Sequence, residues 1–200
     1  MADAVALIKG EAPAGMALSA TGSIEFTRAG LRYSYDVSCF DAANAPVACG
    51  PEADGGTLTV NWDGSYQGLW ITGSAERAGE WTLRGVRGDN PVLSGNGSFD
   101  LSIDYRSLDG RRQSSYDLAY DATYDNVRFD RAAGRPVEGT ITYEVDATRT
   151  ASGPKREASG SFEATAVVTF SAEGASLDVS GDHHYDLNLK TGEAVRKGAR

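Results

Sequence analysis

The stretch Tyr116-Asp-Leu-Ala-Tyr-Asp-Ala-Thr-Tyr-Asp125 contains the longest strict alternation of apolar and polar residues in the chain. Successive side chains of a β-strand point to opposite sides, so this pattern places three tyrosines on one face and three aspartates on the other. A change of phase follows at Asn126, after which Val127 and Phe129 continue the apolar series, and this predicts a β-bulge. The stretch therefore predicts a long strand with one apolar and one acidic face.

The same alternation continues outward in both directions. Asp63-Gly64 and Asp109-Gly110 are strong hairpin-turn signals, and no stretch after Gly22 has helical periodicity. These features predict an all-β domain of about ten long antiparallel strands in a meander, forming a curled sheet or a β-barrel, with a β-sandwich as the alternative. A transmembrane barrel has the same alternation, but the many Ala and Gly residues on the apolar faces weigh against it. The alternating segments are 24–26, 31–37, 58–62, 69–71, 81–83, 99–105, 137–145, 162–170 and 177–189.

Three regions are expected along the chain. Residues 1–20 form an N-terminal tether or short helix, because 9–20 are rich in Gly, Ala and Pro. Residues 21–192 form the antiparallel β domain, and 193–200 form a basic C-terminal tail.

The chain has two cysteines, Cys39 and Cys49, on either side of a turn centred on Asn44. A hairpin there brings the two thiols within reach of each other and predicts a disulfide, with two buried free thiols as the alternative. Disulfides persist outside the reducing cytosol. The pair therefore predicts a secreted or periplasmic protein, or an outer-membrane lipoprotein, whose leader has been removed.

Composition narrows the choice of partners. The 200 residues include 28 acidic and 19 basic side chains, for a formal net charge of −9. A negative surface repels phosphate backbones, so nucleic acid is not an expected partner, and anionic membrane surfaces are disfavoured for the same reason. No apolar run approaches the ~18 residues of a transmembrane helix.

A metal site is the most specific chemistry that the residues allow. On a strand, Asp182, His184 and Asp186 share one face and would bind a transition metal if a facing strand supplied another ligand. Two ordinary strand histidines on a solvated acidic face are the alternative. The chain has no phosphate-binding glycine loop, nucleophile elbow or His-Glu-x-x-His motif, so we assign no catalytic residue and no cofactor.

The aromatic residues Trp62, Tyr66 and Trp70 flank one expected hairpin. Exposed aromatic rings beside polar side chains bind sugars by stacking and hydrogen bonding, whereas core packing explains the same residues without a ligand.

These observations predict a secreted or lipid-anchored bacterial envelope domain with a non-catalytic binding or structural role. One alternative is a carbohydrate-binding module. Another is a subunit that assembles by β-strand addition, with residues 2–9 supplying the strand. Carbohydrate, a small apolar ligand and an envelope protein are the expected kinds of partner. An enzyme is less favoured, since a hydrolase would need a concave pocket with a perturbed carboxylate.

Overall fold

The structure is a computed structural model that describes residues 23–28, 30–154, 156–181, 183–189, 191 and 193–196. For Ser23, Ile24, Phe26 and Arg28 only the backbone is described. The tether or helix expected at 1–20 lies outside the described residues. The strands are β1 (Ser23–Arg28), β2 (Leu31–Phe40), β3 (Pro46–Val47), β4 (Gly55–Gln67), β5 (Ile71–Arg84), β6 (Val92–Arg106), β7 (Gln113–Asp130), β8 (Arg135–Gly153), β9 (Arg156–Phe170), β10 (Ala175–Val179), β11 (His183–Leu187) and β12 (Ala194–Arg196).

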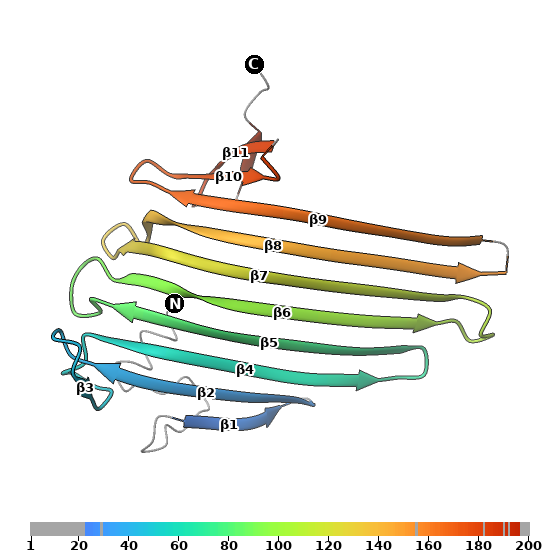
Figure 1. The fold of residues 1–200 in the computed structure, drawn as a ribbon, viewed down its shortest axis with the longest axis horizontal. Coiled ribbons are helices and arrows are strands. Elements are labelled where there is room, and N and C mark those ends of the chain that lie inside the picture. Colours follow the sequence, from blue (N-terminus) through green and yellow to red (C-terminus); the bar gives the residue numbers. More distant parts are fainter. Residues whose placement is uncertain are drawn as a thin grey trace.

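All the described strands belong to one antiparallel sheet (Figure 1). Strands consecutive in sequence are neighbours throughout, except that β3 pairs only with β2. β2 pairs along one edge with β1 and β3 and along the other edge with β4. The outermost strands, β1 and β12, are not paired with each other, so the sheet is open and not a barrel. The predicted all-β meander is confirmed, and it forms one sheet, not the two of a sandwich. The described residues include no helix long and apolar enough to cross a membrane.

The central strands are long, as the alternation predicted. β4 to β9 contain 13 to 19 residues, against the usual five or six. The hairpin predicted at Asp63-Gly64 is wrong, because Gly64 lies inside β4 and pairs with Leu31 on one side and Ala75 on the other. Pairing on both sides keeps this dipeptide extended. The turn predicted at Asp109-Gly110 is confirmed, and Gly110 has the positive φ of 67° that favours glycine.

The bulge predicted near Asn126 is also confirmed. The register between β7 and β8 shifts between Asp125 and Arg128, and Asn126 has a φ of 47°. A second shift lies opposite, between Leu93 and Gly95 of β6. The two shifts are at the same end of the sheet, where bulges increase strand twist.

Apolar packing is concentrated at the end of the sheet where β4, β6 and β8 begin, which we call the closed end. One cluster gathers Val37, Leu58, Val60, Leu83 and Val86, the last from the loop after β5. The segment around β3 packs on the same cluster through Val47 and Cys49. Loops thus supply the second layer that a lone sheet lacks.

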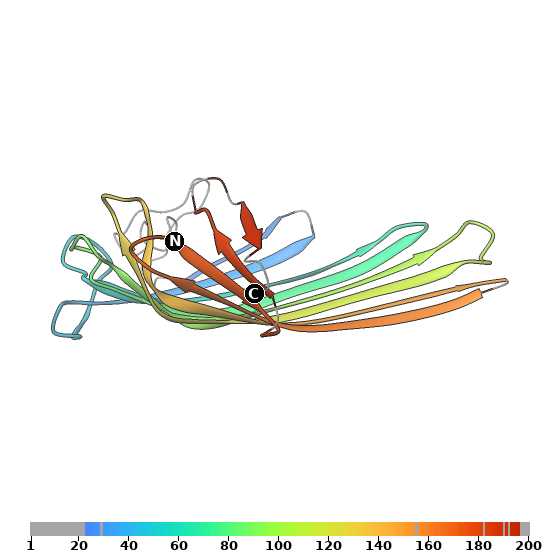
Figure 2. The ribbon, with the colours of Figure 1, turned by 90° about the horizontal axis from the view of Figure 1, so that it is seen from above.

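A second cluster at the closed end surrounds Val127, which is 1% exposed. Ala175 of β10 and Leu187 just across on β11 pack into it. In Figure 2, β10 and β11 rise above one side of the sheet, while the opposite end of β4 to β9 extends as a single layer. We call that opposite end the open end. The sheet therefore curls over its own apolar face at the closed end only.

The sulfur atoms of Cys39 and Cys49 are 1.99 Å apart, at disulfide distance. The turn between them is where it was predicted, with Asn44 at a φ of 63°. The two cysteines are not directly opposite each other, because Cys39 pairs with Val47 and Cys49 lies just beyond β3. The pair ties the β2–β3 hairpin to the first apolar cluster.

The last strand of the sheet lies within the region predicted as a basic C-terminal tail. Residues 194–196 form β12, which pairs with β11 at Tyr185–Leu187. The remainder, 197–200, lies outside the described residues.

Candidate functional site

The metal ligands predicted on β11 are described in part. Asp182 lies outside the described residues, while His184 and Asp186 share one face of the strand, two residues apart. The Nδ1 atom of His184 contacts a carboxylate oxygen of Asp178 on β10. Within the described ranges no group of three or more His, Cys, Asp or Glu side chains is arranged to hold a metal ion. The metal site stays a prediction.

The three aromatic residues predicted as a sugar surface are not brought together. Trp62 lies mid-sheet and half-buried, with its ring centroid 6.2 Å from that of Tyr33 and 5.8 Å from that of Phe99. Tyr66, on the same face, is 63% exposed near the end of β4. Trp70 lies in the β4–β5 turn, where it lines a groove together with residues of β5 to β8 and without Trp62 or Tyr66.

The structure instead forms an aromatic ladder, five rings that cross the sheet on its apolar face. From Phe99 the ladder continues to Tyr120 at 5.3 Å and from Tyr120 to Tyr143 at 6.2 Å, measured between ring centroids. Burial, followed by the neighbouring Tyr124 and Tyr120, raises the pKa of Tyr143 to about 12, and Arg77 opposes the shift. The rings pack on one another, as a core does. The ladder consists of Tyr33, Trp62, Phe99, Tyr120 and Tyr143.

Trp81 extends this packing toward the closed end. Its ring lies over two glycines, because a Cβ atom built on Gly79 or Gly97 would come within 2.2 or 2.7 Å of the indole. The ring meets Tyr124 edge-on at 6.4 Å, and the guanidinium of Arg77 lies 5.9 Å from its centroid. Glycine in these strands thus makes room for a large aromatic side chain.

Charge is divided unequally between the two faces of the sheet. In the regularly paired parts of β4 to β9, the register places every Asp and Glu on the face opposite the aromatic ladder. The apolar face carries three arginines in the same strands, Arg77, Arg149 and Arg156. The acids of the polar face are Asp63, Glu76, Glu80, Asp100, Asp104, Asp117, Asp121, Asp125, Glu144, Asp146, Glu157 and Glu163.

The polar face contains a carboxylate groove of about 700 Å³ that crosses β4 to β8. Asp117 lines the groove and accepts hydrogen bonds from the hydroxyls of Ser102, at 2.7 Å, and Thr148, at 3.4 Å. Arg32 lines the same groove at the β2 side. The groove is open, and solvent and neighbouring hydroxyls stabilise its carboxylates.

The apolar face has a different surface at the open end. Five large side chains are exposed there, and they come from five different strands. An aromatic side chain has about 150–250 Å² of surface, so together the five expose on the order of 500 Å². Apolar patches of this size on single proteins are often functional. This open-end strip consists of Tyr66, Ile71, Tyr105, Tyr116 and Phe162, which are 63%, 39%, 46%, 38% and 58% exposed.

An arginine groove of about 740 Å³ adjoins the strip, with Tyr105 belonging to both. Its arginines come from the β6–β7 turn and from the end of the β8–β9 hairpin, and no Asp or Glu lines it among the described residues. Sequence reasoning missed it, because the four arginines meet only through the register of β7 with β8. The groove is lined by Tyr105, Arg111, Arg112, Gln113, Ser114, Arg149, Ala151, Ser152, Gly153, Pro154, Arg156 and Ala158.

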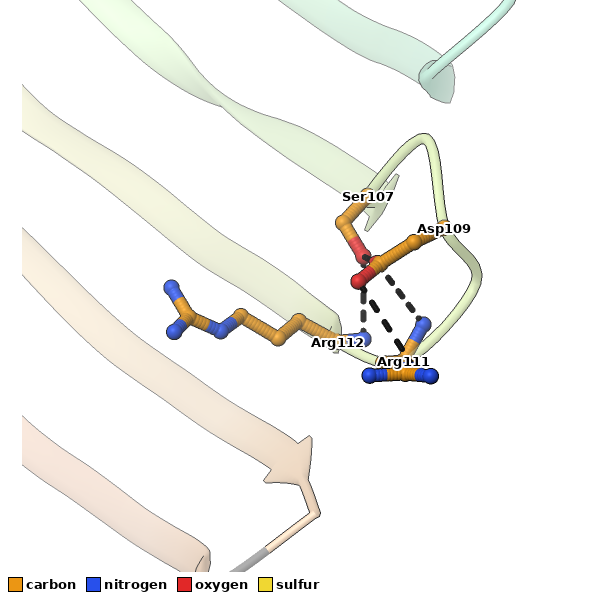
Figure 3. Close-up of polar contacts among 4 residues, drawn as sticks. All are labelled: Ser107, Asp109, Arg111 and Arg112. Carbon is orange, nitrogen blue, oxygen red and sulfur yellow. Dashed lines mark hydrogen bonds and ion pairs between the residues drawn. The ribbon is translucent and has the colours of Figure 1, made fainter.

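The β6–β7 turn is held by a small hydrogen-bond network (Figure 3). The hydroxyl of Ser107 donates to Asp109 at 2.7 Å, and the backbone N–H of Arg112 donates to the Ser107 hydroxyl at 3.0 Å. The Ser107 hydroxyl and the backbone N–H of Arg111 lower the pKa of the Asp109 carboxyl below its ordinary value. In Figure 3 the side chain of Arg112 extends away from Asp109, over the start of β7. The turn therefore fixes the backbone from which two arginines reach the groove.

Comparison with known proteins gave no match to a family model, a curated protein or a solved structure.

Proposed function

We propose that this chain is an exported, non-catalytic domain that binds an apolar ligand or partner on the open-end strip. One observation carries the proposal. At the closed end, loops and β10–β11 cover the apolar face, whereas at the open end the same face keeps its large side chains exposed. Leaving such surface in water has a cost of about 25 cal/mol per Å², which binding would recover.

Two further observations support this proposal. Export is supported by the Cys39–Cys49 pair, because disulfides persist outside the reducing cytosol. A binding role fits the distribution of aromatic side chains, which are enriched at protein binding surfaces because they offer a large contact area at low entropic cost.

Binding of the uncharged fluorescent probe N-phenyl-1-naphthylamine tests the proposal. The wild-type protein should enhance the fluorescence of the probe, and Phe162→Ser should weaken that binding because it removes an apolar side chain of the strip. Val195→Ser is the matched control, since Val195 is 65% exposed on β12, outside the strip. Absent probe binding, or equal loss in both variants, would contradict the proposal.

A second candidate, assembly by strand addition, is supported by the edge of β9. β9 pairs with β8 along the whole length of β9, but with β10 only through residues 166–170. Residues 156–164 therefore have one edge without a strand partner in the described part of the chain. Long open edges of this kind are templates for pairing with another strand.

Sedimentation and hydrogen exchange at increasing protein concentration test this second candidate. Assembly through the edge would slow amide exchange in 156–164 as the oligomer forms. A protein that stays monomeric, or an oligomer without added protection in 156–164, would exclude it.

A further inference from the structure

The arginine groove and the open-end strip meet without a carboxylate between them. Arg149 pairs with Tyr116 of the strip across β7 and β8, and Tyr105 lines the groove itself. A cationic groove therefore continues directly into an exposed apolar surface on the same face of the sheet.

The charges in the groove are largely uncompensated. The ion pair of Arg111 with Asp109 is 4.0 Å long, and its side chains are 75% and 61% exposed. Such a surface pair contributes little. Among the described residues Arg149 and Arg156 form no ion pair, and both are exposed. Within a chain of net charge −9, this concentration of arginine favours an anionic group.

Arginine suits phosphate in particular, because its planar guanidinium donates two parallel hydrogen bonds to two oxygens of one group. An inorganic anion alone, however, would leave the adjoining strip exposed. A second copy of the chain packed face to face about a two-fold axis would cover the strip but would place like-charged arginines near each other. A ligand with an anionic head and an apolar chain matches both surfaces.

We propose that the arginine groove and the open-end strip together bind one anionic lipid molecule. Arg149 and Arg156 hold the phosphate of its head, Arg111 and Arg112 add positive charge from the β6–β7 turn, and its acyl chain lies on the strip. This inference rests on the proposed function, since it uses the same apolar surface and names its ligand class.

Competition against N-phenyl-1-naphthylamine with two lysolipids, each kept monomeric, tests the inference. The lysolipids are lysophosphatidylglycerol, which is anionic, and lysophosphatidylcholine, which is zwitterionic, and they carry the same acyl chain. Both lysolipids present a phosphate to the arginines, but the choline of the zwitterionic one adds a positive charge that the arginine groove repels. The anionic lysolipid should therefore bind about tenfold more tightly. The double variant Arg149→Gln with Arg156→Gln should lose this preference and keep its affinity for the uncharged probe.

The control is the double variant Arg32→Gln with Arg106→Gln, which removes the same charge from the polar face. It should keep the preference for the anionic lysolipid. Equal loss in the two double variants would show a general effect of net charge and would overturn the inference.

The remaining outcomes separate this inference from the proposed function. Probe binding without any preference between the lysolipids would overturn the lipid inference and leave the proposed function standing, whereas absent probe binding would refute both. Inorganic phosphate that binds as tightly as lysophosphatidylglycerol would show an anion site only. Dimerisation that abolishes probe binding would show that a second copy covers the strip. Either result would overturn the inference.

Discussion

At the residue scale, the alternation of Tyr and Asp on β7 predicted correctly which side chains would share a face. The three tyrosines Tyr116, Tyr120 and Tyr124 lie on the apolar face and the three aspartates on the polar face. The sequence could not show how the rings would meet. The ladder depends on cross-strand register, which places Phe99 directly opposite Tyr120.

Tyr143 offers a test of the ladder through pH. Its pKa is raised to about 12, so the folded state retains this phenol proton at a pH where an unfolded chain, with a pKa near 10, has released it. Stability should therefore fall as pH rises from about 10 to about 12. The Tyr143→Phe variant should lose part of this fall, together with a tyrosinate absorbance step near pH 12. An unchanged absorbance step would place Tyr143 outside a desolvated ladder.

At the element scale, turn signals were reliable where no neighbouring strand competed. Asp109-Gly110 forms a turn at the open end, whereas Asp63-Gly64 stays extended between β2 and β5. Local propensity is weak beside the backbone hydrogen bonds and side-chain packing of a central strand. The positions of the bulge and of the Cys39–Cys49 turn followed from local chemistry and were predicted.

Glycines within strands give a second test. Gly95 has a φ of 146°, and a Cβ atom there would lie 2.2 Å from the carbonyl oxygen of Glu80. Gly95→Ala should therefore lower the free energy of unfolding by more than about 2 kcal/mol in urea. Gly160 on β9 has no atom within 4 Å of the added Cβ, so Gly160→Ala should be neutral to within about 0.5 kcal/mol. Equal effects at the two positions would contradict the packing of β5 against β6.

The cysteine pair gives a third test. Titration of the unfolded, unreduced protein should find no free thiol. Replacing both Cys39 and Cys49 with alanine should lower the free energy of unfolding by about 3 kcal/mol, as expected for a loop of this size. Two titratable thiols in the unfolded, unreduced protein would remove the support for the proposed extracytoplasmic location.

At the scale of the whole molecule, the all-β meander was predictable from the sequence. How much of its apolar face would be covered by loops and other strands was not. Alternation reports that one face is apolar and leaves open what covers it. The net charge was also an incomplete guide to the ligand, because it is a sum over both faces of the sheet. In the regularly paired parts of β4 to β9 the acidic side chains lie on one face, and the charged side chains of the other face are all arginines. The arginine groove was beyond prediction, since it joins two turns that only the strand register brings to the same end.

The central claim is that the apolar face is covered at the closed end and exposed at the open end. Two phenylalanines of β9 on the same face test it directly, Phe162 at 58% exposure and Phe170 at 9%. Hydroxyl-radical footprinting of the free protein should oxidise Phe162 several-fold faster than Phe170, and added lysophosphatidylglycerol should protect Phe162. Equal oxidation of the two residues in the free protein would contradict the account.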